Sequence, residues 1–181
     1  MRNQIITLVI LLSLGSSAQA QTISGFVEEM NVVSESGSTT PEFNLYVKGP
    51  IKGKFGWTSW GLITKEWSEA TIGVTYAPAD WIEVSWSAGV ETNEKPLRHS
   101  PSIWVGKGKW SLLSVLEDGG SGYWYNYLGA YQVSGTVSAG VYSQKFVGTG
   151  PYISKSFGRF SLWGAYAVGD NRGIITARMK F

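Results

Sequence analysis

Apolar and polar residues alternate with a period of two along several stretches of the chain. Within the stretch Trp81–Thr92, one set of alternate positions is apolar and the other is polar. The apolar set is Ile82, Val84, Trp86, Ala88 and Val90, and the polar set is Glu83, Ser85, Ser87, Gly89 and Glu91. Because successive side chains of a β-strand point to opposite faces, this pattern predicts strands with one apolar and one polar face.

Turn-forming residues divide the rest of the chain into short runs rich in β-branched and aromatic side chains. No stretch keeps the apolar repeat of about 3.6 residues that marks an amphipathic helix. This rhythm predicts an all-β fold with twelve strands. The expected strands are Thr22–Val33, Glu42–Lys48, Phe55–Lys65, Ala70–Ala77, Trp81–Thr92, Ser100–Gly106, Lys109–Asp118, Tyr123–Gln132, Thr136–Lys145, Pro151–Ser156, Phe160–Gly169 and Gly173–Phe181.

Composition decides whether the apolar faces of such strands pack inward, as in a soluble barrel, or face lipid, as in a membrane barrel. Hydrophobic residues make up 43% of the 181 residues and charged residues only 15%, whereas soluble domains carry about 25% charge. The polar faces are rich in Gly, Ser and Thr, which suits a crowded interior better than a solvated surface. We therefore predict a closed antiparallel up-and-down transmembrane β-barrel of twelve strands, with ten- or eight-stranded barrels and a soluble barrel as alternatives.

The N-terminal residues have the order of features found in an export signal. Arg2 precedes the apolar run Ile5–Leu14, which is too short to span a bilayer, and Ala18-Gln19-Ala20 is a small-x-small cleavage site. We expect residues 1–20 to be a signal peptide and residues 21–181 to form the barrel. The chain has no cysteine, which excludes disulfides, thiolate metal sites and attachment of a lipid to a cysteine.

The connections between the expected strands alternate in length and charge. The odd-numbered connections hold every longer loop, and the even-numbered connections are tight, as in barrels with long external loops and short periplasmic turns. Acidic residues gather at the odd connections: Glu35, Glu42, Glu66, Glu69, Glu91, Glu94, Glu117, Asp118 and Asp170. Basic residues gather at the even connections: Lys52, Lys54, Lys107, Lys109, Lys155, Arg159 and Lys180.

The last segment ends on Phe181, preceded at period two by Met179, Ala177 and Ile175. It resembles the closing strand of bacterial outer-membrane barrels, whose terminal aromatic residue is recognised by the barrel-assembly machinery. The whole layout resembles small monomeric outer-membrane porins of twelve strands, such as those that pass acidic sugars. The resemblance implies a Gram-negative outer-membrane location with both termini in the periplasm. It also implies contact with outer-membrane lipids and lipopolysaccharide, and with the assembly machinery through Phe181.

The lumen of such a barrel is expected to carry charges of both signs, unlike a one-sidedly basic channel. The candidate lumen-lining charges are Lys48, Glu83, Glu91, Arg178 and Lys180, and the bulky candidates are Tyr46, Trp104, Tyr142 and Trp163. These charges either line a narrow polar path that selects solutes or form ion pairs that close the lumen. The predicted function is a passive or weakly selective channel for small solutes. A structural, adhesion or receptor-like barrel without transport is the alternative.

A lipid-active enzyme is a weaker alternative. The single histidine, His99, stands next to Ser100 and near Ser102 in an expected external loop, and a hydrolase needs a serine within hydrogen-bond reach of a histidine base. We expect His99 to be a solvated loop residue and assign no catalytic residue. We also predict no cofactor and no metal site, because one histidine and no cysteine leave only carboxylates as ligands. Without Arg2, the mature chain has fourteen basic and thirteen acidic residues. Because its net charge is close to zero, we expect no nucleic-acid partner.

Overall fold

The computed structural model describes residues 22–181. The expected signal peptide, residues 1–20, and the expected first residue of the mature chain, Gln21, lie outside the described residues. Among residues 22–181, no helix is long and apolar enough to cross a membrane.

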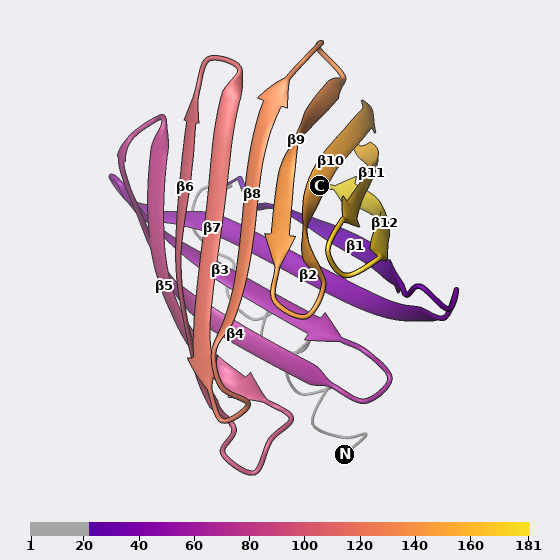
Figure 1. The fold of residues 1–181 in the computed structure, drawn as a ribbon. Coiled ribbons are helices and arrows are strands. Elements are labelled where there is room, and N and C mark those ends of the chain that lie inside the picture. The colour runs from indigo at the N-terminus through magenta and orange to yellow at the C-terminus, as the bar shows by residue number, and fades with distance from the viewer. Residues whose placement is uncertain (1–21) are drawn as a thin grey trace.

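Twelve antiparallel strands form one closed sheet (Figure 1). Each strand pairs with its neighbours in the chain, and the first strand pairs with the last from Phe26 opposite Lys180 to Val33 opposite Gly173. The strands are β1 (Ser24–Val33), β2 (Thr39–Lys52), β3 (Phe55–Ile63), β4 (Ser68–Ala79), β5 (Ile82–Glu91), β6 (Leu97–Lys107), β7 (Trp110–Gly119), β8 (Trp124–Gln132), β9 (Val137–Gln144), β10 (Gly148–Phe157), β11 (Phe160–Ala167) and β12 (Arg172–Lys180). The predicted fold class and strand number are confirmed.

Several strands continue through prolines at which the sequence predicts that they begin or end. β2 contains Pro41 and Pro50, and β10 contains Pro151. A proline has no N–H to donate to the neighbouring strand. Pairing with that strand is therefore interrupted near some of the prolines. The β6–β7 pairing skips Ser100 and Pro101, and a bulge follows Pro50 in the β2–β3 pairing.

The outer face of the barrel is apolar and its inner face is polar over much of the wall. On neighbouring positions of β4 and β5, Val74 is 55% exposed and Trp86 is 53% exposed, whereas Ser87 is only 5% exposed. Val84 and Val141 also lie on the outer face. This arrangement is the reverse of a soluble barrel, in which apolar residues fill the interior. The predicted assignment of the two faces is confirmed for β5, β9 and β12.

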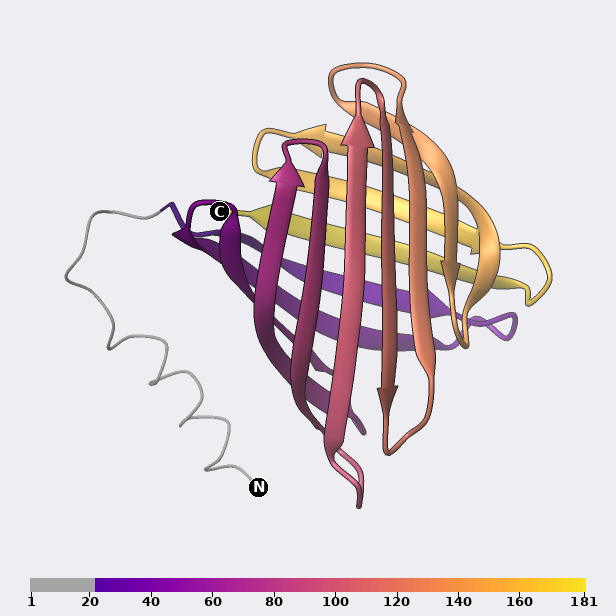
Figure 2. The ribbon, with the colours of Figure 1, turned by 90° about the vertical axis from the view of Figure 1, so that its left-hand side faces the viewer.

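The two ends of the barrel differ, and Figure 2 shows connections emerging at opposite ends. We call the end with the odd-numbered connections, residues 34–38, 64–67, 92–96, 120–123, 145–147 and 168–171, the loop end. The opposite end, with the turns at 53–54, 80–81, 108–109, 133–136 and 158–159, is the turn end. The prediction that the odd-numbered connections hold every longer loop is wrong for 133–136, because this turn is longer than the loop 145–147. Val133 and Ser134 both donate to the carbonyl of Val137 and close this turn.

The apolar outer face predicts how the barrel responds to a charge placed on it. Val74→Arg, near the middle of β4, should lower the free energy of unfolding in lipid vesicles by about 2–4 kcal/mol, because arginine is costly at the bilayer midplane. Leu97→Arg is the matched control at the loop end of β6, where the same change costs about 0–1 kcal/mol. Urea titrations of the refolded variants measure both values. Equal effects at the two positions would show that this face does not contact hydrocarbon.

Candidate functional site in the barrel lumen

Two ion pairs lie on the inner face of the barrel, nearer the turn end: one joins β2 to β5, and the other joins the directly paired strands β1 and β12. The Lys48 ammonium lies 3.0 Å from the Glu83 carboxylate, and the Arg178 guanidinium lies 2.6 Å from Glu28. Arg178 also covers the ring of Phe26 at 4.0 Å. Lys48, Glu83 and Arg178 therefore lie on the inner face, where the sequence analysis expects them.

Lys180 occupies the same inner phase of β12 as Arg178 but lies at the turn end, where it is exposed. Among residues 22–181, no ion pair or side-chain hydrogen bond is found for it. The alternation thus placed Lys180 on the expected face but did not indicate how close to the end of the barrel its side chain would lie.

A buried cluster of four charged residues lies near the loop end. Arg98 pairs with Glu91, lies 2.8 Å from Glu117 and approaches Glu69 at 3.6 Å. The side chain of Arg98 is only 3% exposed, and the three carboxylates are buried equally well. One guanidinium therefore faces three carboxylates.

The strand register explains why Arg98 is needed. Glu69 on β4 stands directly opposite Glu91 on β5, and like charges at such positions repel. Arg98 stands on the next strand, opposite Gly89 of β5, and its guanidinium lies close to both carboxylates. Of these four residues, only Glu91 was predicted from the sequence to line the lumen.

Hydrogen bonds fix most of the carboxylate oxygens in this cluster. Ser121 donates from its backbone N–H and its hydroxyl to Glu91, at 2.6 and 2.9 Å. Ser100 donates to Glu117 at 3.0 Å, and the Trp67 indole donates to Oε2 of Glu69 at 3.1 Å. The other oxygen of Glu69, Oε1, is buried and has no hydrogen-bond partner.

An apolar cluster fills the opposite side of the lumen. It consists of Met30, Tyr142, Val147, Trp163, Ala167 and Ile174, which come from β1, β9, β11, β12 and the loop before β10. The rings of Tyr142 and Trp163 lie 5.4 Å apart. Asn126 donates to the Tyr142 hydroxyl at 2.8 Å, and the Trp163 indole donates to Glu28 at 2.9 Å. Two of the predicted bulky residues thus narrow the lumen from one side.

The lumen wall on β5 and β6 remains polar and carries small side chains. The hydroxyls of Ser85 and Ser102 lie 2.6 Å apart, and Ser87 lies on the same face of β5. Trp104 stands opposite Glu83 on this wall, closer to the turn end. The lumen is therefore two-sided, with a polar wall facing an apolar one.

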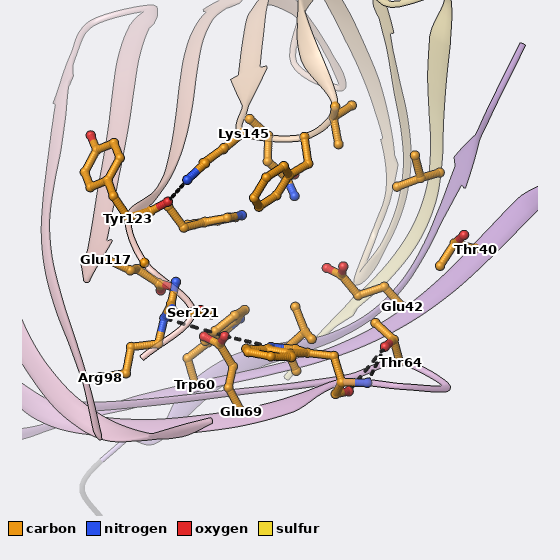
Figure 3. A pocket seen from close by; sticks show the side chains of 18 residues that line it. Thr40, Glu42, Trp60, Thr64, Glu69, Arg98, Glu117, Ser121, Tyr123 and Lys145 are labelled. Carbon is orange, nitrogen blue, oxygen red and sulfur yellow. Dashed lines mark hydrogen bonds and ion pairs between the residues drawn. The ribbon is translucent and has the colours of Figure 1, made fainter. Parts of the chain in front are cut away.

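A cavity of about 440 Å³ lies inside the barrel at the loop end. We call it the vestibule. Its lining combines three tryptophans, Trp60, Trp67 and Trp124, with the carboxylates of Glu42, Glu69 and Glu117. Figure 3 shows Glu69, Arg98, Glu117 and Ser121 gathered on one side, with Glu42 standing apart from them.

At the rim of the vestibule, Lys145 donates to the backbone carbonyl of Tyr123 and lies over the rings of Tyr123 and Phe146. Hydrogen bonding to Tyr127 raises the pKa of the Tyr123 phenol above its ordinary value. The rim therefore holds one ammonium, which is already bound, beside a neutral phenol.

The predicted position of His99 is wrong. The residue lies in β6 and not in a loop, because β6 begins at Leu97 and pairs Leu97 with Val90 of β5. His99 points outward and stacks on Trp86 at 5.5 Å, whereas Ser100 points inward to Glu117. Ser102 pairs with Ser85. Across the described chain, no hydrogen bond joins His99 to a serine, so the nucleophile–base pair that the hydrolase alternative needs is not assembled.

No protein-family model and no curated protein sequence matches this chain. Solved structures do match. The barrel is similar to a KdgM porin with a TM-score of 0.59 at 9% identity, over 86% of this chain and 99% of that one. It is also similar to a KdgM porin in complex with disordered oligogalacturonate, with a TM-score of 0.55 at 10% identity, over 87% of this chain and 99% of the other.

The described chain has a porin-like barrel fold. At these identities the likeness establishes the architecture of the wall and not the solute, so the chemistry of the lumen must be derived from its own residues. The expected resemblance to small outer-membrane porins is confirmed at the level of fold.

The burial of Arg98 predicts a large difference between two charge removals in the lumen. Arg98→Gln should lower the free energy of unfolding by about 3–5 kcal/mol, because it leaves buried carboxylates uncompensated. Lys48→Gln, which breaks the half-buried Lys48–Glu83 pair, should cost about 1 kcal/mol or less, because this pair is more open to water than Arg98. Denaturant unfolding of both variants in the same detergent measures the difference. Equal losses would contradict the assignment of Arg98 as the centre of the loop-end cluster.

Proposed function

We propose that this barrel is an outer-membrane channel for the passive or weakly selective passage of small solutes. The observation that carries the proposal is the vestibule of about 440 Å³ at the loop end, which lies beside a lumen wall of small polar residues on β5 and β6. A solute that enters the vestibule meets hydroxyl groups along this wall and does not have to displace the apolar cluster.

The strand number supports a narrow passage. Barrels of eight strands are filled by side chains, whereas barrels of sixteen or more enclose an open water channel. Twelve strands lie between these sizes, and the cluster around Tyr142 and Trp163 occupies part of the cross-section. The proposed passage is therefore restricted to small solutes. The likeness to porins supports the same proposal.

We propose that both termini lie in the periplasm and that the loop end lies outside, as the alternation of the connections along the sequence predicts. The vestibule then faces the cell exterior, beside lipopolysaccharide, and the outer face contacts outer-membrane lipids. The backbone of Phe181 pairs with Gly25 at the turn end and its side chain is exposed. This position leaves the ring accessible to the barrel-assembly machinery, which we propose as its partner.

We propose no enzymatic role. The proposal is supported by the outward position of His99, which the barrel wall separates from the serines of the lumen. A His99→Ala variant that leaves lipid composition unchanged in cells would agree with it.

Conductance in planar bilayers tests the proposed channel. The mature chain should give steady single-channel currents, and Ser102→Trp should lower the conductance by roughly half or more because it fills the polar side of the lumen. Ile103→Trp is the matched control, since it adds the same side chain at the next position on the outer face of β6. Glu83→Gln and Arg178→Gln should change the ion preference with smaller effects on the current.

The absence of current at all voltages would overturn the channel and favour a barrel without transport. Equal conductance in the Ser102→Trp and Ile103→Trp variants would contradict passage along the wall formed by β5 and β6.

A further inference from the structure

The loop-end half of the lumen has an excess of negative charge. Four inward carboxylates, Glu42, Glu69, Glu91 and Glu117, lie there with the single buried guanidinium of Arg98. The only other cation on the described vestibule lining is Lys145, whose ammonium is held at the rim by the Tyr123 carbonyl. The vestibule therefore attracts cations and repels anions.

One carboxylate oxygen in the vestibule lacks the partner that burial normally requires. Glu69 Oε1 is buried and accepts no hydrogen bond, although Oε2 of the same residue is held by the Trp67 indole at 3.1 Å. Buried acceptors without a donor are costly and rare in folded proteins. Since the indole fixes the carboxylate and Glu69 lines the vestibule, a ligand that enters with an N–H group can supply the missing donor once the side chains that cover Oε1 shift aside.

The aromatic lining of the vestibule suits the same kind of ligand. Trp60, Trp67 and Trp124 come from β3, the following loop and β8, and all three line the cavity. Tryptophan faces attract organic cations through their π electrons, with larger gains where water is excluded. The volume of about 440 Å³ lies within the range of roughly 300–1,000 Å³ that is typical of small-molecule sites.

A bare metal ion fits the vestibule poorly. Arg98 occupies the space between Glu69, Glu91 and Glu117, and its guanidinium already binds two of them closely. Within residues 22–181, no group of three or more acidic or histidine side chains is arranged to hold a metal ion.

We propose that the vestibule binds a small organic cation carrying N–H donors, of the ammonium or guanidinium class, with Glu69 as the recognising carboxylate. Glu69 Oε1 accepts a hydrogen bond from the cation, and the tryptophan faces cover its alkyl part. The inference deepens the proposed channel function by naming the class of solute that enters, but binding itself does not require an open path through the lumen.

Equilibrium binding tests the inference on the refolded mature chain in detergent. Agmatine, which carries one ammonium and one guanidinium group, is titrated while tryptophan fluorescence is recorded. We expect saturable binding, weaker binding of tetramethylammonium, which has no N–H, and none of glutarate. Glu69→Gln should weaken agmatine binding by about tenfold or more, because a charge-assisted hydrogen bond loses its charge.

Glu66→Gln is the matched control, because it removes the same charge from the exposed loop before β4 and does not line the vestibule. This variant should bind agmatine as the unaltered chain does. Three results would overturn the inference: no saturable binding of agmatine, equal affinity in the Glu69→Gln variant, or tighter binding of Ca²⁺ or Mg²⁺ than of agmatine.

The outcomes separate this inference from the channel proposal. Bilayer currents without agmatine binding would overturn only the cation site. Agmatine binding that depends on Glu69 in a barrel without current would overturn only the channel.

Discussion

The requirement that every backbone N–H and C=O finds a partner inside the wall governs this structure. In hydrocarbon no water is present to satisfy an open edge, so a sheet that crosses a membrane must close on itself. The pairing of β1 with β12 over Phe26 to Val33 provides that closure. Once the sheet is closed, each side chain points either into the lumen or toward the hydrocarbon. The apolar set that includes Ile82, Val84 and Trp86 must therefore face outward.

Closure also explains why the lumen contains buried charge. A soluble barrel fills its interior with apolar residues, but here those residues are needed outside, so the interior takes polar and charged residues that must be paired. Arg98 shows the result, because it compensates the repulsion between Glu69 and Glu91 that the strand register creates. The apolar cluster around Tyr142 and Trp163 reduces the number of polar groups that need partners on the other side.

The sequence was sufficient to predict the twelve strands, the two faces and the sorting of charge between the two ends, because each follows from a local period or from the order of turns. It did not predict the Arg98 cluster. Glu69 and Glu91 are far apart in the chain, and only the register of β4 and β5 makes them neighbours. Met30 and Ile174 occupy inward positions that the polar–apolar rule assigns to polar residues. His99 was misplaced because the turn residues before it suggested a longer loop than residues 92–96.

The seam between β1 and β12 has a consequence for the order of events during biogenesis. Its partners, such as Glu28 and Arg178, lie on the first and the twelfth strand, so the final contacts of the ring become available only after β12 has been synthesised. Until then both edges are exposed, and contacts between such distant segments are slow to form. A nascent chain of this design must be kept from pairing with other chains until its last strand meets its first.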